Sequence, residues 1–247
     1  MIKFFRQIRR AMVKENRAWN YFLYAIGEIV LVVVGILIAL QLNIANENRK
    51  SRNSEKIYLE NIKSDLEQNL VSLQIFASER ERAIAASDSI LTYFNMEKPL
   101  DLVAFNRHCV IVMVWLPTVQ HDNTYQELLN SGSLSVISNK EIKEYLQNIQ
   151  TKFEKVAFIE GEMQQDFEQY LYDPFFETAD LQSSLMSFDG KDVVLDSSQA
   201  MTLLNNQAFK NGFVLSSFNS QSLLEEYDEI TESIHRLNDL IDMDLKE

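Results

Sequence analysis

The chain of 247 residues contains only six glycines and three prolines, which disfavours a turn-rich all-β domain and favours long helices. Its single cysteine, Cys109, excludes an internal disulfide and any multi-cysteine metal site. The net charge of −13 divides into +5 over residues 1–20, from six basic groups and Glu15, and −18 over the rest, from 17 basic and 35 acidic groups. An acidic main part repels phosphates, so we expect no nucleic-acid partner.

Residues 1–20 predict a basic amphipathic tail on the cytoplasmic side of a membrane. Ile2, Phe5, Ile8 and Met12 recur at helical spacing. Basic residues lie between them, and we expect these to contact lipid or to fix topology: Lys3, Arg6, Arg9, Arg10, Lys14 and Arg17. The alternative to a lipid or partner contact is that the tail only enforces orientation.

Residues 21–43 predict a transmembrane helix. The run Tyr21–Leu42 reads YFLYAIGEIVLVVVGILIALQL, and fourteen of its 22 residues are Phe, Leu, Ile or Val. These contribute about −6 kcal/mol to insertion, against roughly 2–3 kcal/mol for an ionised Glu28. Its length suits a hydrocarbon core of about 30 Å.

Two alternatives to a membrane anchor are a cleaved signal peptide and a buried globular helix. The apolar core is long for a signal peptide, and no A-x-A pattern follows it. The aromatic residues Trp19, Tyr21 and Tyr24 at one edge are typical of a membrane interface rather than of a globular core. The denser basic flank is N-terminal, so we expect the N-terminus in the cytoplasm.

Residues 44–247 predict an extracytoplasmic, periplasmic domain built as an antiparallel helical bundle, which makes the chain all-α. Its long helices are expected at about 52–95, 139–172 and 213–245, from apolar residues at steps of three and four. The first should continue the membrane helix, because no Pro or Gly lies between Gly35 and Pro99.

The segments between the three long helices contain residues that predict where shorter helices begin and end. Leu102–Trp115 is β-branched enough for a strand, but its neighbours favour a buried helix ending before Pro117. Capping boxes are predicted at Thr124–Glu127 and Ser138–Glu141. We expect Asp173-Pro174 to end the second long helix, residues 175–197 to form a loop with a short extended piece at Val193–Leu195, and the stretch from about Ser198 to Leu245 to break near Gly212.

Three stretches carry a resemblance: the basic start MIKFFRQIRR, the membrane run GEIVLVVVGILIALQLN (Gly27–Asn43) and NTYQELLNSGSLSVISNKEIKEYL (Asn123–Leu146). Over its whole length the chain resembles a set of uncharacterised single-pass proteins of Bacteroidota that share a domain of unknown function. The resemblance implies an inner-membrane protein of a Gram-negative cell with a periplasmic domain. It implies no activity.

Glu28 is the most distinctive candidate site residue. It lies roughly 10 Å into the span, and Gly35 and Ala39 share its helix face seven and eleven residues on. Gly35-x-x-x-Ala39 is a pair of small residues that permits close approach of another helix. We expect this face to pack against a partner membrane helix. The alternatives are proton coupling by Glu28, a protonated Glu28 that is merely tolerated near the interface, and a Glu28 that pairs with Arg17 or a lipid headgroup.

Outside the membrane run, Thr124, Tyr125 and Gly132 mark a possible partner surface, whose alternative is a tight helix–helix corner. His108 and Cys109 point about 100° apart on a helix, and His121 and His235 are isolated, so we expect a core cysteine and surface histidines. The sequence shows no nucleophile motif, glycine-rich phosphate loop or zinc spacing, so we expect no catalytic residue, cofactor or metal.

Three hypotheses of function follow. The first is a non-enzymatic accessory, scaffold or sensor subunit that works with a membrane-protein partner or as a homo-oligomer. The short cytoplasmic tail has no room for an output domain, which favours the accessory or scaffold form. The second is an ion- or proton-coupled subunit using Glu28, and the third, an envelope enzyme, has no residue to support it.

Overall fold

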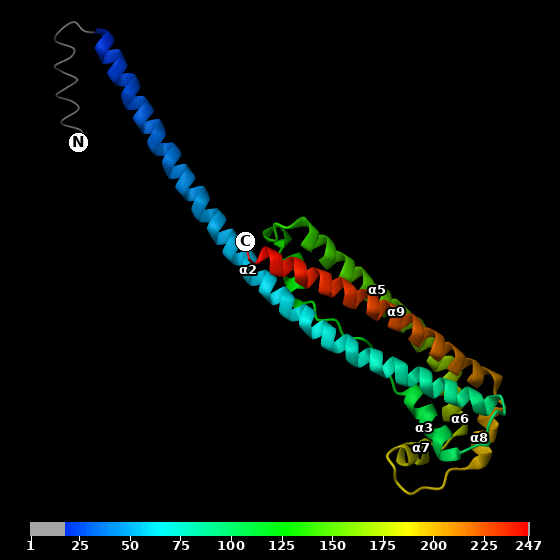
Figure 1. The fold of residues 1–247 in the computed structure, drawn as a ribbon. Coiled ribbons are helices and arrows are strands. Elements are labelled where there is room, and N and C mark those ends of the chain that lie inside the picture. The colour runs from blue at the N-terminus through cyan, green and yellow to red at the C-terminus, as the bar shows by residue number, and fades with distance from the viewer. Residues whose placement is uncertain (1–17, 247) are drawn as a thin grey trace. The chain divides into compact units, whose positions relative to one another are not determined.

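The structure is a computed structural model that describes residues 18–246, and within that range every regular element is helical. The elements are α2 (Ala18–Phe94), α3 (Leu102–Met113), α4 (Asn123–Asn130), the 3₁₀ turn η1 (Leu134–Val136), α5 (Lys140–Phe167), the π-helical turn η2 (Glu168–Tyr172), α6 (Asp173–Thr178), α7 (Leu181–Phe188), α8 (Ser197–Leu204) and α9 (Gln207–Asp244) (Figure 1). The predicted all-α class is confirmed. Residues 1–17, with Lys3, Arg6, Arg9, Arg10, Lys14 and Arg17, lie outside the described residues.

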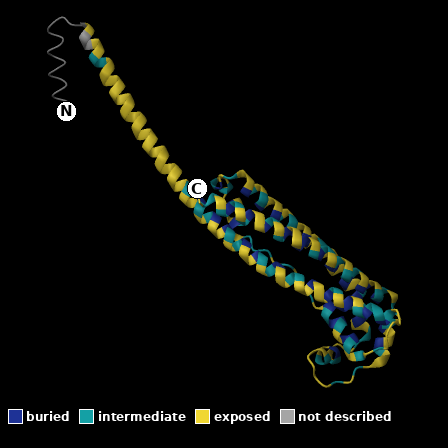
Figure 2. Ribbon diagram, viewed as in Figure 1, coloured by how far each residue is buried: buried dark blue, intermediate teal, exposed yellow. Residues whose placement is uncertain are grey.

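The first of two compact units ends at Lys56 and contains the apolar part of α2. This helix is long and apolar enough, by length and composition, to cross a membrane. Residues 26–51 are all exposed, so the unit does not bury its apolar surface against its own chain (Figure 2). α2 continues without a break to Phe94, which confirms the predicted continuation.

The second unit, from Ile57 onward, is built around α5, α9 and the second half of α2 (Figure 1). Lys152 pairs with Glu229 and Lys155 with Glu226, so the pairs occur in opposite order along α5 and α9 and the two helices run in opposite directions. The predicted apolar stripes form the core of this unit. Its buried members include Leu59, Ile62 and Leu66 of α2, Ile142, Leu146 and Ile149 of α5, and Ile230, Ile234 and Ile241 of α9.

α3 resolves the ambiguous segment in favour of the buried helix, since it ends at Met113, before Pro117. Neither predicted capping box forms as expected. α4 begins at Asn123, and its N-cap position is occupied by Asp122 rather than Thr124. α5 is capped by Asn139, whose Oδ1 accepts from the backbone N–H of Glu141 and Ile142, so the cap lies one residue beyond Ser138.

The expected end of the second long helix at Asp173-Pro174 is wrong. The chain passes from α5 through the π-helical turn η2 directly into α6, and Pro174 lies in the first turn of α6. The expected loop 175–197 contains the rest of α6 and all of α7, whereas Lys191–Asp196 has no regular structure.

Gly212 does not break the last helix. The break lies at Asn205–Asn206, and Asn206 caps α9 by accepting from the backbone N–H of Phe209 at 3.1 Å. Gly212 instead permits close packing on η2, because a Cβ there would lie 2.5 Å from Cδ2 of Leu171 and 3.1 Å from Cβ of Tyr170. Position 212 therefore does require glycine, but the reason is its close contact with η2 and not a break in the helix.

Candidate functional site

An extended segment of residues 114–122 connects α3 to α4 and lies against α2, α5 and α9; we call it the strap. Buried polar side chains from these three helices hold it at two points. Along its length it exposes apolar side chains: Val114 at 65%, Leu116 at 71% and Val119 at 54%. An extended strap with exposed apolar residues, fixed from below by buried polar groups, is the most distinctive feature of the second unit.

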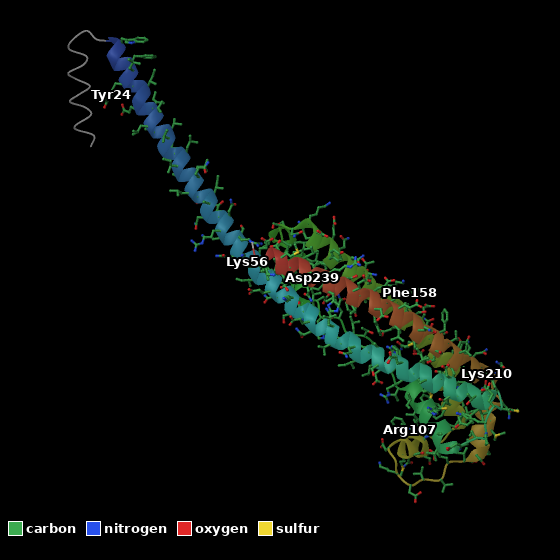
Figure 3. The ribbon with its side chains drawn as sticks, in the orientation of Figure 1. Tyr24, Lys56, Arg107, Phe158, Lys210 and Asp239 are labelled. Carbon is green, nitrogen blue, oxygen red and sulfur yellow. The ribbon has the colours of Figure 1, made fainter. Side chains whose placement is uncertain are left out.

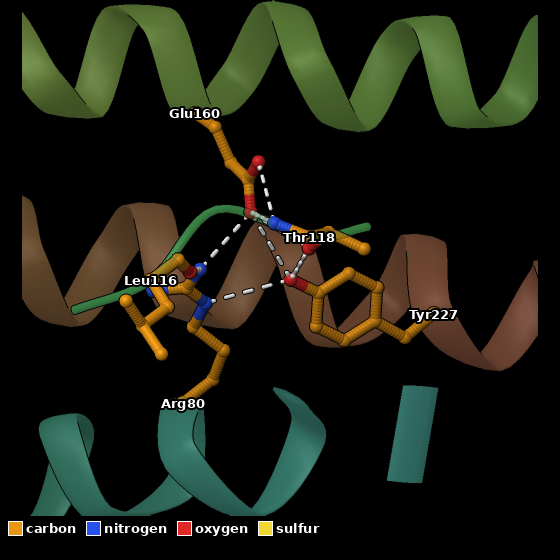
Figure 4. A network of polar contacts seen from close by, with 5 residues as sticks. All are labelled: Arg80, Leu116, Thr118, Glu160 and Tyr227. Carbon is orange, nitrogen blue, oxygen red and sulfur yellow. Dashed lines mark hydrogen bonds and ion pairs between the residues drawn. The ribbon is translucent and has the colours of Figure 1, made fainter. Parts of the chain in front are cut away.

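The first fixing point is a buried ion pair between Arg80 of α2 and Glu160 of α5, which are 3% and 5% exposed. Nη2 of Arg80 donates to Oε1 of Glu160 at 3.0 Å and to the carbonyl oxygen of Leu116 at 3.0 Å. Glu160 accepts from Thr118 of the strap, from the backbone N–H at 2.9 Å and from Oγ1 at 2.7 Å (Figure 4). The pair therefore joins two helices and the strap in one network.

Tyr227 of α9 completes this network. Its hydroxyl lies 2.6 Å from Oγ1 of Thr118, and burial raises the pKa of its phenol. The Arg80 guanidinium carbon also lies 5.3 Å from the ring centroid of Trp115, within cation–π range. All three long helices thus contribute a polar side chain to the same point on the strap.

The second fixing point is Asn69 of α2, which is 2% exposed. Its side-chain amide donates to the carbonyl oxygen of His121 and accepts from the His121 N–H, both at 2.7 Å. The His121 ring Nε2 lies 3.2 Å from Oγ of Ser72. The amide therefore pairs with the strap backbone as a neighbouring strand would.

The chemistry of this arrangement is positioning. The Glu160 carboxylate accepts hydrogen bonds from Arg80 and from two groups of Thr118, so its lone pairs are engaged by donors rather than aimed at open space. Beside it, a cavity of about 270 Å³ is lined mainly by apolar side chains of α2, α3 and the strap, including Ile75, Ile111 and Leu116. Such a network holds the strap backbone in place.

The sequence reasoning missed this site, although a signal for it was present. Glu160 lies between Val156 and Met163 at steps of four and three, within the apolar stripe of α5. A charged residue at a core position requires a partner, and that rule would have singled out Glu160. Nothing in the sequence alone pairs it with Arg80 or Thr118.

The residues predicted in the membrane run are all exposed in the structure. Glu28, Gly35 and Ala39 lie on one face of the first unit, and a Cβ built on Gly35 meets nothing within 4 Å.

The predicted partner surface at Thr124 and Tyr125 is wrong, because both residues are buried at 8% exposure. Gly132 is exposed at φ +68° and follows the end of α4, where its N–H donates to the carbonyl oxygen of Leu129. This geometry ends a helix in a left-handed residue and matches the alternative reading, a tight helix–helix corner.

The cysteine and histidines are placed as follows. Cys109 is completely buried, as predicted, and burial raises the pKa of its thiol well above the usual value. His108 is half-buried rather than a surface residue, and its Nδ1 has no hydrogen-bond partner among the described residues. His121 is half-buried beside Ser72, whereas His235 is exposed.

Within residues 18–246, these features define a helical protein with one N-terminal helix of membrane-crossing length and apolarity and a second helical unit with a buried polar network. The model of a family of unknown function, DUF6090, matches residues 28–205, more than half of the chain. The chain therefore belongs to this family. No curated protein and no solved structure matches it.

Proposed function

We propose that the protein is a single-pass inner-membrane subunit without catalytic activity, which acts as an accessory, scaffold or sensor component of a larger assembly. In this proposal residues 1–20 lie in the cytoplasm, residues 21–43 cross the bilayer, and the rest forms a periplasmic antiparallel helical bundle. The resemblance to single-pass proteins of Bacteroidota supports the same topology.

The observation that carries the proposal is the face of Glu28, Gly35 and Ala39. A bare membrane anchor needs only apolar length, and a carboxylate in the span opposes insertion. Two small residues on the same face allow another helix backbone to approach closely. Residues 26–51 are exposed in the described part of the chain, which leaves this face accessible to a helix of another molecule.

The strap supports a scaffold role for the second unit. Its backbone is fixed by Arg80, Glu160 and Asn69, while Val114, Leu116 and Val119 face outward. A contact surface fixed before binding loses less conformational entropy on association.

Two glycines in the apolar run provide a matched test. Gly35 lies on the proposed face, whereas Gly27 lies about 100° away from Glu28. A Cβ at either position meets nothing within 4 Å of the chain itself, so Gly35→Leu and Gly27→Leu both leave the protein's own packing intact.

The experiment is purification of the full chain from its own membranes in mild detergent, with each variant compared to wild type for size and co-purifying subunits. We expect Gly35→Leu to lose at least tenfold of the associated subunit and Gly27→Leu to retain it. Wild-type protein that purifies alone as a monomer, or equal behaviour of the two variants, contradicts the proposal.

Glu28→Gln separates packing from ion coupling. The amide has the same shape and keeps hydrogen-bonding capacity but carries no titratable proton. An assembly that survives Glu28→Gln together with loss of an ion-dependent activity would favour the ion-coupled alternative over a purely structural face.

A further inference from the structure

α7 presents its apolar side to solvent and its polar side to the protein. Leu181, Leu185 and Phe188 recur at steps of four and three, so they share one face, and they are 43%, 44% and 38% exposed. Ser184 is 4% exposed and lies on the inner side. A surface helix normally buries its apolar stripe, so α7 is inverted. We call Leu181, Leu185 and Phe188 the outer face of α7.

α7 is closed at both ends by local hydrogen bonds and is tied to α3 in the middle. Nδ2 of Asn106, from α3, donates to the carbonyl oxygen of Ser184 at 2.9 Å. Asp180 caps the N-terminus by accepting from the backbone N–H of Gln182 at 3.1 Å. At the other end Gly190, at φ +78°, closes the helix, and the Lys191 N–H donates to the carbonyl oxygen of Met186 at 2.9 Å. The outer face is therefore exposed by a well-bonded structure and not by fraying.

Acidic residues lie at both ends of α7, since Asp180 is its N-cap, Asp189 is its C-cap and Asp192 follows shortly after, and all three are exposed. The stretch 173–199 carries six acidic residues and one basic residue, Lys191. Asp189 lies at the C-terminal end of α7, where the helix dipole disfavours a negative charge, and Lys191 lies 3.7 Å from it. Arg107, on the neighbouring α3, is the exposed base beside this region (Figure 3).

Charge decides among the possible occupants of this face. A second copy that docked through the same face would bring two sets of these carboxylates together, and anionic lipid headgroups would be repelled by the same carboxylates. An apolar helix with lysine or arginine at its ends would cover Leu181, Leu185 and Phe188 and would pair with the carboxylates at the ends of α7.

We infer that the outer face of α7 is a docking site for a different protein, which presents an apolar helix rimmed by basic side chains. This site is independent of the face at Glu28, Gly35 and Ala39.

The test is site-specific photo-crosslinking of the full chain in its own cells, with benzoylphenylalanine at position 185 or 188. The matched control position is Phe158 of α5, an exposed aromatic residue at 69% exposure (Figure 3). We expect an adduct from positions 185 and 188 and none from 158. Mass spectrometry of the adduct should find a joined peptide with Lys or Arg within one helical turn of its apolar residues.

Charge reversal provides the second arm. Asp189→Lys combined with Asp192→Lys should lower the adduct yield at position 185 at least fivefold, because the basic rim of the partner is then repelled. Glu162→Lys combined with Asp228→Lys makes the same charge change at exposed positions of α5 and α9 and should leave the yield unchanged. Circular dichroism melting of each variant verifies that the fold is retained.

Several results overturn the inference. These are no adduct at 185 and 188, equal adducts at 158, an adduct that contains a second copy of this chain or only lipid, and a joined peptide without basic residues. An adduct whose yield is unaffected by Asp189→Lys with Asp192→Lys also overturns it. None of these outcomes depends on the membrane face, so Gly35→Leu and this experiment succeed or fail separately.

Discussion

Breaking the buried pair Arg80–Glu160 should destabilise the second unit far more than breaking an exposed pair on the same helix. Arg80→Met removes the guanidinium that donates to both Glu160 and Leu116, and leaves a carboxylate that is 7% exposed without its counter-ion. Loss of one partner from a buried ion pair costs about 3–5 kcal/mol. For a unit of this size that lowers Tm by about 6–20 °C.

The matched control is Arg82→Met on the same helix. Arg82 pairs with Glu79 at 2.8 Å, and both side chains are 55% exposed. Exposed pairs contribute about 0.2–1 kcal/mol, because water screens them and both side chains lose conformational entropy. Arg82→Met should therefore lower Tm by less than about 4 °C.

The assay is thermal unfolding of the full chain in detergent, followed by circular dichroism, for Arg80→Met, Glu160→Gln and the double variant. The double variant should be less destabilised than the sum of the two single variants, since neither buried charge is left alone. Amide exchange at Thr118 should accelerate in Glu160→Gln, because that N–H donates to the Glu160 carboxylate. Equal effects of Arg80→Met and Arg82→Met would refute the assignment of the network as the support of the strap.

Three further predictions test the packing and the electrostatics of the second unit. Gly212→Ala should destabilise by up to about 2 kcal/mol in urea unfolding, because overpacking against Leu171 at about 1–3 kcal/mol outweighs a helix-propensity gain of about 1 kcal/mol. Gly161→Ala, whose Cβ meets nothing within 4 Å, should stabilise by about 1 kcal/mol, and the same sign for both substitutions would contradict the close approach. Asn69→Leu leaves the N–H and carbonyl of His121 unpaired and should cost about 2 kcal/mol or more, with faster amide exchange at His121; unchanged exchange would argue against the second fixing point. Burial, reinforced by repulsion from Lys98 and Arg107, lowers the pKa of His108, so the unfolded state binds the proton more readily and the wild type should lose stability as the pH falls below about 6.5. Urea midpoints between pH 5 and 8 should show this loss reduced in His108→Gln, and identical pH profiles would contradict it.

The sequence by itself determined the helical class, the long uninterrupted α2 and the apolar stripes of α5 and α9. These features depend on local periodicity and on the absence of proline and glycine, so neighbouring residues carry the whole signal. Glu28, Gly35 and Ala39 were likewise found from spacing alone, because one straight helix fixes their common face.

Tertiary structure decided the features that depend on distant residues. Pro174 predicts a helix end, but the π-helical turn carries the chain into α6. Gly212 predicts a helix break, but it permits close contact with Leu171. Arg80, Thr118, Glu160 and Tyr227 are separated by up to 147 residues in the chain, and only folding brings their polar atoms to one point. The inverted orientation of α7 was also invisible, because an amphipathic stripe shows that a helix has two faces and does not show which of them the rest of the fold covers.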